Sequence, residues 1–175
     1  GLFHSSMGMW LIQECMRIWE SKGMLLTYKE LITKIEHSSI HSVIPPNDER
    51  FFSPDDITEE IGAYCQDTDQ AIPVNPEDFT RVIFDSLALE LKRSIQKLQQ
   101  ATGSRFERII LAGGGSQNVY IYRKISEFSG IQVIKGPTES TVAGNIILQA
   151  RVMNWVDDED QANEIIHSSF PQLKH

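Results

Sequence analysis

Apolar side chains recur every three or four positions through residues 8–103, which is the spacing of helices that bury one face. The longest such stretch begins at Asn75 and Pro76, a capping residue followed by a first-turn proline, and ends at Thr102 and Gly103. Its apolar stripe consists of Phe79, Ile83, Leu87, Leu91, Ile95 and Leu98. We expect this long helix to form the spine of the chain.

Three shorter helices are predicted before it. The first covers residues 8–21, and the second follows Thr27 and Glu30, which have the spacing of a capping box. The third is expected to start at residues 53–56, where a serine, a proline and two acids suit a helix N-terminus, and to run to about Cys65. A short strand is expected at residues 42–44, ended by two prolines.

The pattern changes after residue 103. Residues 106–115 read as a short buried strand, 116–130 as a helix, 131–136 as a second strand and 137–155 as a second helix. This order implies parallel strands joined by right-handed crossovers, so the fold class is α/β with a helix-rich first half. An acid-led helix closes the chain.

The sequence therefore divides into segments of different character. Residues 7–103 are helical, 104–155 form the βαβα unit, and 156–170 form the terminal helix. Residues 1–6 have neither a helical nor a strand pattern, so we treat them as a start that is appended to the native sequence or disordered.

Charge and cysteine content narrow the function classes. The formal net charge is −8, which opposes general nucleic-acid binding and requires that any anionic ligand be held by local donors. Cys15 and Cys65 are the only cysteines and have no metal-ligand spacing, which favours a reduced, cytoplasmic protein. No apolar run reaches membrane-spanning length, and no signal peptide opens the chain.

Three consecutive glycines follow the first predicted strand, in "IILAGGGSQN". A helix N-terminus after a strand suits an anion such as phosphate, and glycines let a nucleotide approach the backbone. The alternative is a tight turn with positive φ. Two known motifs are excluded, because a dinucleotide fingerprint would need glycine where Asn118 stands and no Gly-Lys-Ser/Thr follows.

The turn after the second strand repeats this arrangement with Gly136, but here plain capping and close packing are favoured. Gly144, beside Ala143, is expected to let the last helix of the unit pack closely against a neighbour. His37 and His41 are four residues apart but lie among loop-forming residues, so no metal site is expected. Asp85 is expected at the surface or in helix packing.

Five stretches in order, "MGMWLIQECMRIWE", "DERFFSPDDI", "IFDSLALEL", "LAGGGSQN" and "GPTESTVAGNI", resemble successive motifs of the FGGY carbohydrate-kinase family, in its rhamnulokinase branch. This family belongs to the actin-like (ribonuclease H-like) ATPase superfamily and binds ATP and sugar between two lobes. The resemblance implies that residues 7–175 are the distal part of the C-terminal lobe, on the nucleotide side.

The resemblance also implies site residues and cofactors. Gly114 matches a family ATP contact, with Gly113 and Gly115 shaping the same turn, and Asn118 would line the adenosine pocket. Gln13 matches a further ATP contact, although a polar residue beside an apolar stripe is more often on a solvated face. ATP and Mg²⁺ are the implied cofactors, and no metal ligand is assigned to the chain.

The implied parent reaction is transfer of the γ-phosphoryl group of ATP to L-rhamnulose, giving L-rhamnulose 1-phosphate. The family's catalytic Asp would lie upstream, so no catalytic residue is assigned here and the chain alone is expected to be inactive. Its implied partners are ATP, a ketose sugar and the N-terminal lobe. Self-association of the isolated chain is expected for a different reason, because a small sheet without its flanking strands has unpaired edges and exposed apolar area. Two alternatives stay open: a non-catalytic actin-like module that binds a nucleotide or a partner, and an FGGY kinase of another sugar such as fuculose or xylulose.

Overall fold

A computed structural model describes residues 8–113, 118–136, 140–153, 155–156 and 158–169. Its elements, in chain order, are α1 (Gly8–Ser21), α2 (Tyr28–Lys34), the 3₁₀ helices η1 (Ile35–His37) and η2 (Glu49–Phe51), α3 (Ile57–Asp67), α4 (Pro76–Thr102), β1 (Arg108–Leu111), α5 (Val119–Ser129), β2 (Gln132–Lys135), α6 (Ser140–Val152) and α7 (Glu159–Ser169). The expected start at residues 1–6 lies outside the described residues.

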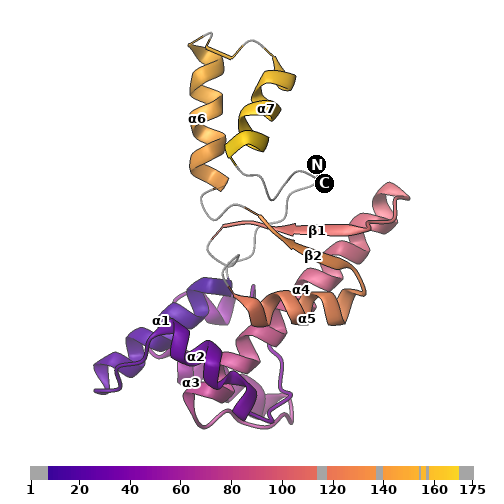
Figure 1. Cartoon of the computed structure of the whole chain (residues 1–175). Coiled ribbons are helices and arrows are strands. Elements are labelled where there is room, and N and C mark those ends of the chain that lie inside the picture. Colours follow the sequence, from indigo (N-terminus) through magenta and orange to yellow (C-terminus); the bar gives the residue numbers. More distant parts are fainter. Residues whose placement is uncertain (1–7, 114–117, 137–139, 154, 157, 170–175) are drawn as a thin grey trace.

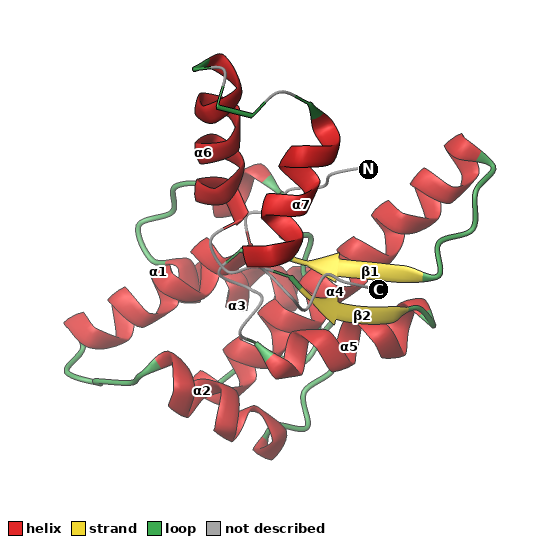
Figure 2. Cartoon of the chain, turned by 45° about the horizontal axis from the view of Figure 1, so that its top comes forward, coloured by secondary structure: helices red, strands yellow, loops and turns green. Residues whose placement is uncertain are grey.

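The long helix α4 is confirmed as the spine, with α1, α2, η1 and α5 packed along it (Figures 1 and 2). The Asn75 side chain caps its N-terminus by accepting from the backbone N–H of Asp78, and Pro76 occupies the first turn. The helix ends at Gly103, whose φ of 66° is in the left-handed region that glycine tolerates. Phe79, Ile83 and Ile95 of the expected stripe are buried.

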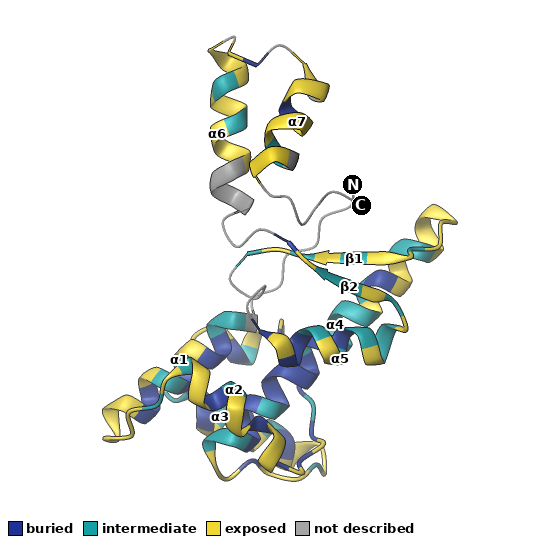
Figure 3. Ribbon diagram, in the orientation of Figure 1, coloured by how far each residue is buried: buried dark blue, intermediate teal, exposed yellow. Residues whose placement is uncertain are grey.

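The core lies among α1 to α5 and not around the sheet (Figure 3). Phe84 of α4 is fully buried, with its ring centroid 6.2 Å from that of Tyr28 and 6.4 Å from that of Tyr120. These three aromatic rings join α2, α4 and α5. The position of α5 is therefore set by the helical half of the chain.

The third helix begins later than the sequence indicated. Asp56 is its N-cap and accepts from the backbone N–H groups of Thr58 and Glu59, so the helix runs Ile57–Asp67 and does not start at residue 53. Desolvation raises the pKa of Asp56, but hydrogen bonds from Lys22, Thr58 and Glu59 outweigh it and lower the pKa to about 2. The expected cap at Ser53 is therefore wrong, and these hydrogen bonds place the cap at Asp56.

The strand expected at residues 42–44 is wrong, because this segment pairs with a side chain and not with another strand. The backbone N–H of Val43 donates to Oε1 of Gln70 over 2.8 Å, and Nε2 of Gln70 donates to the Val43 carbonyl over 2.9 Å. The Ser42 hydroxyl donates to the carbonyl of Ala71. Ser42 and Ile44 are buried and Val43 is half-buried, but the segment lacks the backbone ladder of a strand.

The strands β1 and β2 are parallel, as expected, with Ile109 opposite Val133 and Ile110 opposite Ile134. The expectation of a fully buried first strand is wrong. Ile109 and Leu111 pack against the helical core, whereas Ile110 on the opposite face is 58% exposed. A short apolar run predicts burial on both faces, and in the described chain α4 and α5 cover only one.

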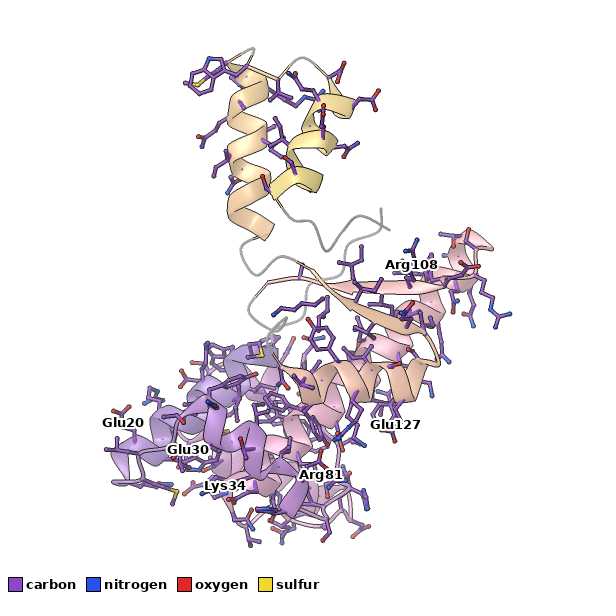
Figure 4. All side chains as sticks on the ribbon, in the orientation of Figure 1. Glu20, Glu30, Lys34, Arg81, Arg108 and Glu127 are labelled. Carbon is purple, nitrogen blue, oxygen red and sulfur yellow. The ribbon has the colours of Figure 1, made fainter. Side chains whose placement is uncertain are left out.

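Helices α6 and α7 stand apart from the rest of the described chain (Figures 1 and 4). The expected close packing at Gly144 is wrong, because Gly144 is exposed and an added Cβ would meet no atom within 4 Å. Large apolar side chains are exposed on and beside the two helices: Ile146, Leu148, Val152, Met153, Trp155 and Ile165. Among the described helices, none combines the length and apolar character needed to cross a bilayer.

We expect the isolated chain to form dimers of about twice its mass at micromolar concentration, because exposed apolar area and the open face of a small sheet both favour association. Replacing Leu148 and Trp155 with Gln should shift this equilibrium toward the monomer. Leu25→Gln is the matched control, since Leu25 is 80% exposed but lies between α1 and α2. Light scattering measures the mass, and a monomer across the whole range would contradict the expectation.

Candidate functional site

The turn from β1 into α5 contains the described part of the glycine motif. Gly113 follows the strand with a φ of +84°, a conformation that side chains rarely adopt. An added Cβ at Gly113 would meet no atom within 4 Å, so this glycine faces open space. Gly114 and Gly115, the other two candidates, lie outside the described residues. At Gly113 the backbone conformation thus favours glycine, and there is space beside the backbone for a ligand.

Asn118 begins the next helix and is fully buried. Its Oδ1 accepts from the backbone N–H of Ile121 over 3.1 Å, which caps α5. Its Nδ2 donates to the hydroxyl of Tyr28 over 2.9 Å. Both ends of the amide thus have partners within the protein, and a direct contact between Asn118 and a nucleotide stays a prediction.

Gln13 lies on an exposed face of α1 and lines a groove of about 380 Å³ together with Met16, Leu26 and Thr27. Met9 lies one turn before Gln13 on the same side of α1. The hydroxyl of Tyr28 lies 3.8 Å from the Met9 sulfur. Tyr28 therefore connects the start of α1 with the N-terminus of α5. The sequence did not indicate Tyr28 as part of this site.

In the turn that follows β2, the glycine is required by close packing and not by a positive φ. Gly136 is buried, and an added Cβ would lie 2.8 Å from Cγ2 of Ile110 and 3.2 Å from the Leu111 carbonyl. The Gly136 N–H donates to this carbonyl over 2.9 Å. The packing interpretation is confirmed for Gly136, while Pro137 and Thr138 lie outside the described residues.

A buried polar network attaches α5 to α4. The hydroxyl of Tyr120 donates to Oδ1 of Asp85 over 2.7 Å, and Arg81 lies 3.6 Å from the other Asp85 oxygen and donates to the Ser38 carbonyl (Figure 4 labels Arg81). Burial, then the Asp85 carboxylate, raises the pKa of Tyr120 far above its ordinary value, so its hydroxyl stays a donor. Asp85 is therefore a buried helix-packing acid and not a surface residue.

His37 ends η1 and His41 follows in the connecting segment, so the two do not share a helical face. Within the described ranges, no group of three or more His, Cys, Asp or Glu side chains is placed to hold a metal ion. Cys15 and Cys65 are free and buried. The described chemistry of the site is thus that of a glycine turn and a capped helix N-terminus.

The sequence was compared with known proteins. Residues 2–153 match the FGGY family of carbohydrate kinases, C-terminal domain. The chain therefore belongs to the FGGY carbohydrate-kinase family, whose C-terminal domain has the actin-like ATPase fold. Rhamnulokinase of Oceanobacillus iheyensis is 34% identical over 164 residues, which covers 94% of this chain and 34% of that protein. The chain thus spans about a third of the length of this relative.

Proposed function

We propose that this chain is the nucleotide-binding part of a sugar kinase that transfers the γ-phosphoryl group of ATP to L-rhamnulose, giving L-rhamnulose 1-phosphate. The observation that carries the proposal is the open space at Gly113, between a parallel strand and the N-terminus of α5. A turn from a strand into a helix N-terminus offers an anionic ligand unpaired backbone N–H groups and the positive end of the helix dipole. The similarity to a rhamnulokinase supports the choice of sugar.

The residues of this turn suit the nucleotide better than the metal. Gly113 leaves room for a ribose or phosphate beside the backbone, and the helix N-terminus favours negative charge. Mg²⁺ supplies charge neutralisation at the transferring phosphates, and it would be bound by those phosphates and by residues outside the described part of this chain. We place the protein in the cytoplasm, which accords with its two free thiols.

The proposed activity belongs to the whole protein that contains this chain. Phosphoryl transfer needs the sugar hydroxyl, the γ-phosphate, the metal and a base aligned in a closed cleft. Here we assign to the chain only the nucleotide side, with Gln13, Gly113, Gly114, Gly115 and Asn118 as its candidate contacts. The base and the sugar-binding groups would come from the rest of the protein.

Gly113→Asn in the whole protein should weaken ATP binding at least tenfold and leave L-rhamnulose binding unchanged. Asparagine tolerates positive φ, so the substitution tests the added side chain more than backbone strain. Calorimetric titration with ATP, and separately with the sugar, measures both affinities. A side chain in the open space at Gly113 would compete with the nucleotide for that space.

Gly103→Asn is the matched control for this experiment. Gly103 also has a positive φ and open space around it, but it ends α4 and has no proposed ligand. Unaltered ATP affinity in Gly113→Asn would remove the glycine turn from the nucleotide site. An equal loss in both variants would attribute the effect to the backbone.

A further inference from the structure

Tyr28 brings together three elements that are far apart in sequence. It is the first residue of α2, and its hydroxyl lies 2.9 Å from Nδ2 of Asn118 and 3.8 Å from the sulfur of Met9. Its ring packs edge-on against Phe84 of α4. The phenol therefore anchors its ring in the core and directs its hydroxyl at the residue that starts α5.

The hydroxyl of Tyr28 is not needed to form its own helix. The N-terminus of α2 is closed by a capping box, in which Thr27 accepts from the Glu30 N–H and Glu30 accepts from the Thr27 N–H. Of the two described contacts of the Tyr28 hydroxyl, the shorter is with Asn118, 90 residues further along the chain. The contact thus serves α5 and not α2.

Asn118 depends on this contact because it is fully buried. Its Oδ1 can cap Ile121 only while the amide group keeps one orientation, and the Tyr28 hydroxyl accepts from the opposite end of that amide. Without the Tyr28 hydroxyl, the buried Nδ2 of Asn118 would lose its hydrogen-bond acceptor. Rotation of the amide to find another acceptor would break the bond between Oδ1 and the Ile121 N–H.

We propose that Tyr28 is a positioning residue for nucleotide binding: through the Asn118 amide it fixes the first turn of α5, against which the nucleotide is held. This inference rests on the proposed function of the glycine turn. The pKa of Tyr28 is raised by burial, an effect that the hydrogen bond from Asn118 opposes, so the hydroxyl remains protonated and can both accept from Asn118 and donate toward Met9.

The test is a double-mutant cycle in the whole protein. Tyr28→Phe removes the hydroxyl and keeps the ring, while Asn118→Ser keeps an N-cap side chain and removes the amide that reaches Tyr28. Each single variant should raise the dissociation constant for ATP roughly tenfold, the effect of one lost hydrogen bond, and Tyr28→Phe should leave kcat within about twofold. The double variant should bind ATP no more weakly than the weaker single variant, because both substitutions break the same contact.

Tyr64→Phe is the matched control, since it also removes a tyrosine hydroxyl from a partly buried ring, but on α3 and beside Phe51. It should leave ATP affinity unchanged. Hydrogen exchange at the Ile121 amide gives a readout that does not depend on the nucleotide, and it should accelerate about tenfold in Tyr28→Phe. Additive losses in the cycle, or an unchanged exchange rate at Ile121, would overturn the inference.

The failures of the two proposals are distinguishable. If Gly113→Asn loses ATP binding while Tyr28→Phe retains it, the positioning role of Tyr28 is wrong and the glycine turn stands. If exchange at Ile121 accelerates in Tyr28→Phe while both variants bind ATP normally, the nucleotide site lies elsewhere, and the positioning inference is overturned with the proposed function.

Discussion

The 175-residue chain alone is expected to show no L-rhamnulose-dependent release of ADP from Mg-ATP. General-base catalysis alone contributes about 10²–10⁴-fold, and alignment of the reactants contributes more, so turnover should fall at least 10⁴-fold below that of the whole protein. Four aspartates already have structural roles. Asp56 and Asp158 cap α3 and α7, Asp78 accepts a hydrogen bond from Ser38, and Asp85 accepts one from Tyr120.

The assay couples ADP release to NADH oxidation, with the sugar omitted as the blank and the whole protein as the positive control. Nucleotide binding by the isolated chain should be weak, because the proposed cleft has only one side. Sugar-dependent turnover that persists through further purification of the 175-residue chain would show that the catalytic groups lie within it. The assignment of the base to another part of the protein would then be wrong.

Phe84→Ala should lower the free energy of unfolding of the isolated chain by about 3–5 kcal/mol, the usual cost of emptying a fully buried phenylalanine site. The effect should lie at the upper end, because the Phe84 ring contacts both Tyr28 and Tyr120 and so joins α2, α4 and α5. Urea denaturation followed by circular dichroism measures the change. A loss of this size is comparable to the whole stability of many domains.

Phe52→Ala provides the comparison for this measurement. Phe52 is 46% exposed, so the same chemical change should cost about 1 kcal/mol or less. If the two variants unfolded at the same urea concentration, the aromatic cluster around Phe84 would not be the centre of the core. If Phe84→Ala does not fold, Phe84→Leu, which leaves a smaller cavity, should show a reduced loss of the same sign.

The sequence predicted the helical half well because its signals are local. The stripe, the Asn75 cap and the terminal Gly103 of α4 all lie within one helix, and the capping box of α2 spans four residues. The start of α3 was misplaced because Ser53 and Pro54 also have the pattern of a helix start, whereas the hydrogen bonds to the Asp56 side chain fix the cap three residues later.

Contacts over long sequence distances could not be predicted. The strand expected at residues 42–44 failed because its partner is the side chain of Gln70, and burial of β1 failed because one face of the sheet is open in the described chain. At the candidate site, the glycines were evident from their order after a strand. Tyr28 was not, since its relation to Asn118 spans 90 residues and follows no periodicity.

Two of the polar contacts of α5 also bear on the order in which the chain folds. The capping box of α2 and the N-caps of α3 and α4 close within a few residues, whereas the Tyr120–Asp85 bond joins residues 35 apart and the Asn118–Tyr28 bond joins residues 90 apart. Closing longer loops costs more chain entropy, and nascent chains emerge from the ribosome N-terminus first. The helical half can therefore pack while the residues after it are still being synthesised, and α5, with Asn118 as its N-cap, then docks on a surface that is already formed.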